Sequence, residues 1–412
     1  MIKFEKFILD NGLKVIVHND PSTTIVAFNL LYNVGARDEN PDKTGFAHLF
    51  EHLMFEGSIN IPSYDRPLQQ AGGENNAFTS NDITNYYITL PKENIETAFW
   101  LESDRMLGLD FSEKKLGIQK NVVIEEFNQR YLNQPYGDAF LLLRPLAYKV
   151  HPYQWATIGK DISHIRNANL TDVKDFFMHH YAPNNAILSI TGNVTVDEIK
   201  LLAEKWFGSI PRREITPRNL NIEPIQTEPR VLTVERNVPF DAIYKAFHMS
   251  SKLVKEYYCT DLISDLLANG KSSRLYQKLV KEKKLFSEIN AYITGEIDPG
   301  LFIVNGKLMH GIDMNEAENA INEELHLLTE GNISDYEIEK VKNKFESVYQ
   351  FGQLSGLNKA MNLAYYELLG DAELINHEIE KYRSVSKDEI IQTALTLFRN
   401  ENSSTLYYLA KK

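Results

Sequence analysis

Three polar side chains occur at a chemically useful spacing in an otherwise apolar stretch that runs from Thr44 to Gly57. His48 and His52 are four residues apart with Glu51 between them, in the order H-x-x-E-H. The stretch contains no Pro and only one Gly before its end, so the sequence predicts a short, largely buried helix that Thr44 caps and Gly57 stops. Positions i and i+4 share one face of a helix, so both imidazoles can reach one metal ion while the carboxylate lies beside them.

This pattern indicates a hydrolytic zinc site. Two neutral imidazoles and one carboxylate hold zinc tetrahedrally and leave a position for a water, whose pKa the metal lowers to about 7. Glu51, as a base rather than a ligand, would take a proton from that water and return it to the leaving amine. Two core histidines beside a glutamate would give the same pattern by chance in roughly one chain of this size in fifty, so a third ligand is required.

A third ligand is expected among acids with apolar neighbours. Residues 112–132 are predicted to be helical and contain the run Asn-Val-Val-Ile-Glu-Glu-Phe. A carboxylate in such surroundings must be paired or must bind a cation, because otherwise it is protonated. Either Glu125 or Glu126 meets this requirement, and helical periodicity does not decide between them.

Length and composition bound the class of protein. The chain has 412 residues, a formal net charge of −12 and a single cysteine, Cys259. It is long enough for two or more domains, and it cannot form an intrachain disulfide. The acidic excess, without any Lys/Arg-rich run, argues against nucleic acid and against an anionic membrane surface. No apolar run reaches the roughly 18 residues of a membrane span. The sequence favours a cytoplasmic protein, and a removed leader with a periplasmic location stays open.

Strands are expected on both sides of the histidine helix. Asn11-Gly12 is typical of a hairpin turn, and residues 24–34 form a long apolar strand. Residues 75–79 and 84–90 form a second hairpin, whose first member is polar and small and therefore predicted to be an edge strand. Such an edge can pair with an extended peptide, although the residues alone favour an ordinary solvated edge.

The second half of the chain repeats the pattern of the first. Asp261 and Asp265 stand where the two histidines stand, so the zinc chemistry is absent there. The sequence predicts an α+β fold of two tandem, structurally similar α/β-sandwich domains, each an antiparallel-rich sheet packed on helices and related by internal duplication. Residues 1–210 would be the zinc-binding catalytic domain, 211–229 a linker and 230–412 a degenerate domain without metal.

Several motifs follow one another along the chain: residues 44–57, 72–79, 100–106, 122–126, 151–153 and 272–276. In this order they resemble the pitrilysin family of inverted-motif (HxxEH) zinc peptidases over essentially the whole chain. The resemblance is greatest to the short bacterial members related to mitochondrial processing peptidase.

The resemblance implies that one Zn²⁺ per chain is held by His48, His52 and Glu126, with Glu51 as general base. It selects the second acid of the Glu-Glu pair, because that acid is the family's ligand. It also reverses the expectation for the edge strand, which becomes the substrate-binding strand through Asn75, Asn76, Ala77, Phe78 and Thr79.

Two departures from the family pattern stand out. An acid that often supports a ligand histidine, two helical turns before the third ligand, is Gln119 here. Active members also use an Arg and, seven residues later, a Tyr from the second half, which clamp the substrate and stabilise the oxyanion. Val280 and Ser287 occupy those places here. Arg274 and Tyr276 lie nearby and are the alternative source of this pair, although they belong to a structural helix motif. Loss of an oxyanion donor typically costs about 10²- to 10³-fold in rate.

The function predicted from the sequence is therefore that of a zinc metalloendopeptidase acting on short or unfolded polypeptides. It would be the metal-bearing subunit of a two-chain complex, whose homologous partner supplies the Arg and Tyr. A homodimer with a differently built clamp is a second possibility. The alternative class is a non-catalytic assembly or structural subunit of the same fold, and the complete set of ligands weighs against it because such relatives tend to lose the zinc motif.

Overall fold

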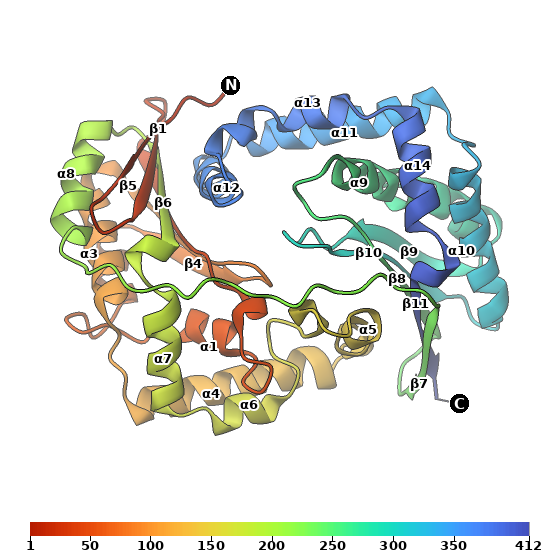
Figure 1. Cartoon of the computed structure of the whole chain (residues 1–412), viewed down its shortest axis with the longest axis horizontal. Helices are drawn as coiled ribbons and strands as arrows, with labels where there is room; N and C mark the ends of the chain where they lie inside the picture. The colour runs from red at the N-terminus through yellow and green to blue at the C-terminus, as the bar shows by residue number, and fades with distance from the viewer. Residues whose placement is uncertain (412) are drawn as a thin grey trace. The chain divides into compact units, whose positions relative to one another are not determined.

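A computed structural model describes residues 1–411 and shows an α+β chain with two compact units (Figure 1). The first unit comprises Met1–Phe127, Trp155–Leu220 and Gln350–His377, and the second comprises Asn128–Gln154, Asn221–Tyr349 and Glu378–Lys412. Each unit contains one sheet packed with helices, which confirms the predicted fold class. Within residues 1–411, no helix combines the length and apolar character that crossing a membrane requires.

The first sheet has six strands. Their spatial order is β1 (Glu5–Ile8), β2 (Lys14–Asn19), β6 (Ala186–Gly192), β3 (Ile25–Tyr32), β5 (Thr84–Pro91) and β4 (Glu74–Thr79). Only β2 and β6 are parallel, and all other neighbours are antiparallel. β3 is interior and paired on both sides, and β4 forms one edge, which confirms the predicted edge strand.

The second sheet repeats this topology with five strands. Their order is β7 (Arg230–Arg236), β11 (Ser403–Ala410), β8 (Ala242–His248), β10 (Leu301–Leu308) and β9 (Phe286–Ile293). Here β7 and β11 are parallel, and the other neighbours are antiparallel. The sequence β7-β11-β8-β10-β9 therefore matches β2-β6-β3-β5-β4 pair by pair, including the single parallel step. The two units are similar folds, as the repeated pattern in the sequence predicts.

Helices of the first unit are α1 (Phe46–Leu53), α2 (Asp65–Gln70), α3 (Ile95–Leu107), α4 (Glu113–Phe127), α6 (Ile162–Asn167), α7 (Leu170–His180), α8 (Val196–Phe207) and α12 (Gly356–Leu368). Those of the second are α5 (Ala139–Ala147), α9 (Lys255–Ala268), α10 (Met314–Thr329), α11 (Asp335–Gly352), α13 (Glu378–Arg383) and α14 (Lys387–Leu397). The first core includes an aromatic row in which Phe99 of α3 packs edge-to-face on Phe28 of β3 and on Phe207 of α8.

Two helices pack on the sheet formed mainly by the other half of the chain. α12 lies against β3 and β6 in the first unit, and α5 lies against β11 and β8 in the second. The predicted linker over 211–229 would assign α5 to the first domain and α12 to the second. The structure has α5 in the second unit and α12 in the first. Apolar burial explains the pairing for α5, whose Leu143 joins a core cluster with Ile303 and Leu406. α12 is also tied by an ion pair, Lys359 Nζ to Asp20 Oδ2 (2.9 Å).

The last turns of α3 hold the segment that follows α1. The buried Asp104 accepts hydrogen bonds from the Ser58 hydroxyl and from the Asn60 backbone N–H (3.0 Å). The backbone N–H of Asp110, just after α3, donates to the carbonyl of Gly57 (3.2 Å). The chain leaving α1 is therefore fastened to α3 and to the loop after it, which fixes the C-terminal side of the helix that carries the histidines.

A buried ion pair lies in the same turn of α3, formed by the residues on either side of Asp104. Arg105 and Glu102 are each 1 % exposed, and Arg105 Nη2 lies 2.6 Å from Glu102 Oε2. The guanidinium packs over the rings of Tyr86 (4.2 Å), Tyr64 (4.7 Å) and Phe55 (5.4 Å), and the Tyr64 hydroxyl donates to Glu102. The motif at residues 100–106 thus has a structural role beneath the segment after α1.

Removing one partner of this pair leaves an uncompensated charge in the core. Arg105→Met should lower the free energy of unfolding by about 3–5 kcal/mol, because Glu102 stays buried without its cation. The double variant Arg105→Met/Glu102→Gln should recover part of the loss. Urea denaturation of the three chains, followed by circular dichroism, measures this. A loss below about 1 kcal/mol for Arg105→Met contradicts the structural role.

Candidate metal centre

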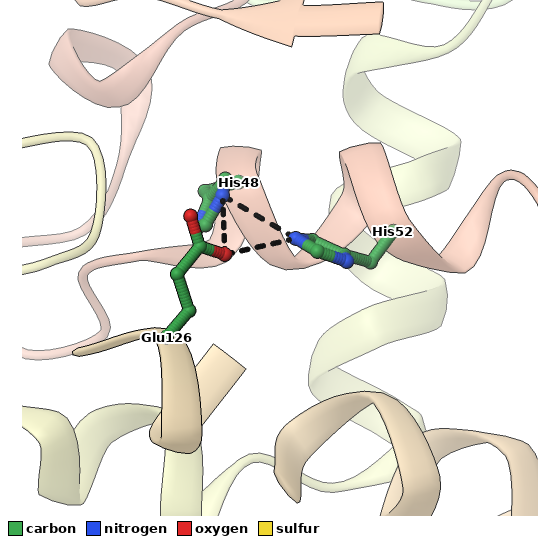
Figure 2. Close-up of side chains that lie close together, drawn as sticks. All are labelled: His48, His52 and Glu126. Carbon is green, nitrogen blue, oxygen red and sulfur yellow. Dashed lines mark hydrogen bonds and ion pairs between the residues drawn. The ribbon is translucent and has the colours of Figure 1, made fainter. Parts of the chain in front are cut away.

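Three donor atoms from two helices meet at one point of the first unit. His48 Nε2, His52 Nε2 and Glu126 Oε2 are each 3.4 Å from the other two, so they form an equilateral triangle (Figure 2). The two imidazole rings are nearly perpendicular, with an interplanar angle of 83°. The side chains are 11 %, 25 % and 17 % exposed, which keeps the group sheltered but accessible. Within residues 1–411 this is the one cluster of three or more such ligands close enough to share an ion.

The triangle has the dimensions of a tetrahedral zinc site. Zn–N and Zn–O bonds of about 2.0–2.1 Å at tetrahedral angles place neighbouring donor atoms about 3.3–3.4 Å apart. The observed 3.4 Å separations need no rearrangement to accept the ion. Two imidazoles and a carboxylate also suit zinc better than Mg²⁺ or Ca²⁺, which prefer all-oxygen ligand sets. The three side chains can therefore hold zinc and leave one tetrahedral position open.

α1 begins two residues before the first histidine, at Phe46, and its N-cap residue is Gly45 with φ of 89°. The prediction that Thr44 caps the helix is wrong. Its hydroxyl instead accepts the backbone N–H of Lys160 (2.9 Å), and its own N–H donates to His164 Nδ1 (3.0 Å). A side chain at Gly45 would come within 2.8 Å of the Ile158 carbonyl oxygen. Glycine is required here because the backbone is left-handed and tightly packed.

The N-terminus of α1 is held by Glu39, which the sequence analysis did not single out. Its two carboxyl oxygens accept the backbone N–H groups of Gly45 (2.9 Å) and Ala47 (2.8 Å). Burial raises the pKa of Glu39 to about 8, opposed by these two hydrogen bonds. The available signal was an acid in the loop just before a helix, where its side-chain oxygens can meet the free N–H groups of the first turn.

Glu126 lies in the last turn of α4, and the chain continues from it into a π-helical turn, Asn128–Leu132. The predicted helix over 112–132 is thus present, with a change of winding just after Glu126. Glu125 is exposed to solvent, and Glu126 is the acid that the structure brings to the histidines. Gln119, two turns earlier, donates its amide to Glu56 Oε1, while its own Oε1 is buried and has no hydrogen-bond partner within the described chain.

Glu51 lies on α1 between the histidines and contacts the edge strand. The Thr79 hydroxyl, at the end of β4, donates to Glu51 Oε2 (2.6 Å). Along β4 the Ala77 backbone N–H donates to the Asn76 side-chain oxygen (2.8 Å), and Asn75 donates to Asp65 (3.1 Å). The structure therefore places one end of the predicted substrate strand directly beside the predicted base.

Phe78 of the same strand is 40 % exposed. The side chains of β4 alternate in exposure, with Glu74, Asn76 and Phe78 exposed and the other three half-buried.

The second unit has no equivalent cluster within the described residues. Asp261, in the place of the first histidine, accepts a hydrogen bond from the Tyr382 hydroxyl (2.5 Å), and burial raises its pKa to about 6. Arg274 donates to both carboxylate oxygens of Glu337 (2.8 and 2.9 Å). That interaction is internal to the second unit, so Arg274 has a structural role there.

The two positions where the family pattern places an Arg and a Tyr make contacts within the second unit. Val280 is partly buried and packs against its core. The exposed Ser287, on β9, donates its hydroxyl to the Lys307 carbonyl (3.2 Å).

Two similar α+β units, one with an H-x-x-E-H helix and one without, are the features of a class of zinc proteases. Each half of the chain also matches a family of peptidases. The family described as Insulinase (Peptidase family M16) matches residues 14–154, and the one described as Peptidase M16 inactive domain matches residues 167–345. The chain belongs to peptidase family M16, and the predicted resemblance to the pitrilysin family is confirmed.

Individual relatives are similar over almost the full length. The zinc protease PqqE of Helicobacter pylori is 28 % identical over 415 residues, covering 98 % of this chain and 92 % of the relative. The beta subunit of the mitochondrial-processing peptidase of Saccharomyces cerevisiae is 23 % identical, covering 95 % and 88 %. The crystal structure of a protease from H. pylori superposes with a TM-score of 0.94 at 28 % identity, covering 99 % of this chain and all of that one.

Loss of the Glu39 carboxyl should loosen the start of α1. Glu39→Ala removes the partner of two buried N–H groups, and each such loss costs about 1–3 kcal/mol of unfolding free energy. The folded pKa lies above the roughly 4.5 of the unfolded chain, so the stabilisation is complete below about pH 4.5 and is lost as the pH rises through about 8. Urea denaturation at several pH values should show the gap between wild type and variant narrowing with rising pH.

Glu113→Ala, at the exposed first turn of α4, is the matched control, and its effect should stay within about 0.5 kcal/mol. Equal effects of the two substitutions would contradict the assignment of a special role to Glu39.

Proposed function

We propose that this chain is a zinc metalloendopeptidase that hydrolyses peptide bonds of short or unfolded polypeptides. The observation that carries the proposal is the 3.4 Å triangle of His48, His52 and Glu126 donor atoms with Glu51 beside it. The full-length similarity to proteins named zinc proteases supports it. The triangle would hold one zinc ion per chain.

When bound, zinc supplies Lewis-acid activation of a water molecule and polarises the scissile carbonyl. The chain's own contribution is proton transfer and positioning. The Glu51 carboxylate accepts the proton of the attacking water and delivers it to the nitrogen of the leaving amine. Glu51 reaches that position because it lies one turn after His48 on α1, on the side from which β4 approaches.

β4 provides the surface for an extended substrate. In an antiparallel pair every second residue directs its N–H and C=O groups away from the neighbouring strand. Ala77 is such a residue, because its N–H donates to the Asn76 side chain rather than to β5. A substrate strand would replace that side-chain oxygen with its own carbonyl and add to the edge of the sheet. Backbone pairing demands an extended chain, which explains a preference for short or unfolded polypeptides.

A second chain would complete the active site. Val280 and Ser287 carry neither a cation nor a phenol at the places where active relatives use an Arg and a Tyr, and Arg274 is engaged by Glu337. The proposed partner is a homologous subunit that supplies this pair, in line with the name of the yeast relative, which is one subunit of a peptidase. A homodimer with another source of these groups is the second form of the proposal.

Zinc analysis tests the metal centre without any substrate. We expect one zinc equivalent per chain, and a rise in the free energy of unfolding of about 2.7 kcal/mol at a free zinc concentration one hundred times the Kd. His48→Ala and Glu126→Gln should abolish the rise, because each removes one of three ligands. Glu125→Gln, the exposed neighbour, should leave it unchanged. A chain that takes up no zinc would favour the non-catalytic assembly role.

Cleavage of a quenched fluorescent, unstructured peptide tests the reaction. The zinc-loaded chain alone should turn over slowly, because a missing oxyanion donor costs about 10²- to 10³-fold. Glu51→Gln should lower this residual rate by a further 10²-fold or roughly that, since it removes the base while the zinc content stays at one. Rapid turnover by the isolated chain contradicts the need for a partner. Equal rates for wild type and Glu51→Gln contradict the role of Glu51.

A further inference from the structure

The contact between Thr79 and Glu51 joins the substrate strand to the base. Thr79 Oγ1 donates to Glu51 Oε2 at 2.6 Å, the length of a hydrogen bond to an ionised acceptor. Thr79 is the last residue of β4, and Glu51 lies in α1, 28 residues earlier in the chain. No feature of the sequence pairs these two residues, because the contact depends on how the hairpin packs against the helix.

Thr79 is held firmly enough to orient another side chain. It pairs with Thr84 across the hairpin, and the Thr84 hydroxyl donates to the carbonyl of Val34 (2.9 Å), just past the end of β3. The turn that follows is closed by the Ser80 N–H to Ile83 carbonyl bond (2.8 Å). A β-branched side chain also has few χ1 choices, so the hydroxyl direction is largely set by the backbone.

The same turn is fastened to the loop before α1. The buried ion pair between Arg37 and Asp82 (2.9 Å) links the loop to the turn. Two backbone bonds support it, from Ala36 N–H to the Ser80 carbonyl (3.1 Å) and from Arg37 N–H to the Asn81 carbonyl (2.9 Å). The end of β4 and the start of the α1 segment therefore move together, which keeps Thr79 at a constant distance from Glu51.

A glutamate base needs such a partner. Its side chain has three rotatable bonds, and only one orientation places a free carboxylate oxygen on the attacking water. The Thr79 hydroxyl binds Oε2 and so restricts the rotation of the Glu51 carboxylate. We propose that Thr79 is a positioning residue for the reaction, acting through Glu51. This inference rests on the proposed function, and it deepens it by making one strand serve both substrate alignment and orientation of the base.

The decisive comparison is between Thr79→Val, which keeps the shape and removes the hydroxyl, and Thr79→Ser, which keeps the hydroxyl. Thr79→Val should lower kcat by roughly 10- to 100-fold, with KM and the zinc Kd unchanged within about twofold, because the backbone edge and the ligands are intact. Thr79→Ser should retain kcat within about threefold. Thr89→Val, the matched control at the other end of the same hairpin, should leave kcat unchanged.

A second readout needs no turnover. In the metal-free chain, urea unfolding of Thr79→Val, Glu51→Ala and the double variant should show effects that are not additive, because one hydrogen bond is lost in all three. Additive effects overturn the inference. So does Thr79→Val with wild-type kcat, or Thr79→Ser as slow as Thr79→Val. A wild-type chain that takes up no zinc overturns the proposed function instead, and the catalytic part of the inference with it.

Discussion

The main constraint on the first unit is that it must hold three electron-rich atoms close together. His48 Nε2, His52 Nε2 and Glu126 Oε2 lie 3.4 Å apart, and they have no mutual attraction unless a cation or a proton lies between them. The fold must therefore hold α1 and α4 together by other interactions. α1 does this by burying Phe46, Leu49, Phe50 and Leu53, which are at most 6 % exposed. Most of the stabilisation around the centre is thus apolar packing, remote from the ligands themselves.

Both ends of α1 are fixed by buried polar groups. Glu39 binds the free N–H groups at the start, and Asp104 of α3 holds the chain that leaves the other end. Each acid is nearly inaccessible to water, so each must satisfy its oxygens within the fold. Because both ends are fixed in this way, a helix of only eight residues can hold two ligands and a base in precise positions. Short helices have little stability of their own, and this one is defined by its surroundings.

Much of this arrangement could be predicted from local pattern. The i and i+4 histidines, the polar edge strand and the repeated order of strands are properties of short segments, and all three are present as predicted. The positions of α5 and α12 could not be predicted, because an amphipathic pattern says that a face is buried and not which sheet buries it. The contacts of Glu39 and Thr79 could not be predicted for a similar reason, because each joins segments whose approach is set by tertiary packing.

The two units show how far a common fold is independent of its chemistry. α9 occupies the place of α1 in the repeated topology, yet Asp261 binds the Tyr382 hydroxyl where the first histidine faces the metal centre. A tyrosine hydroxyl satisfies one carboxyl oxygen and needs no cation, so the second unit keeps its packing without a ligand set. Sheet order and core therefore carry no information about catalysis. The chemistry depends on a few polar side chains, and those are the residues that differ between the units.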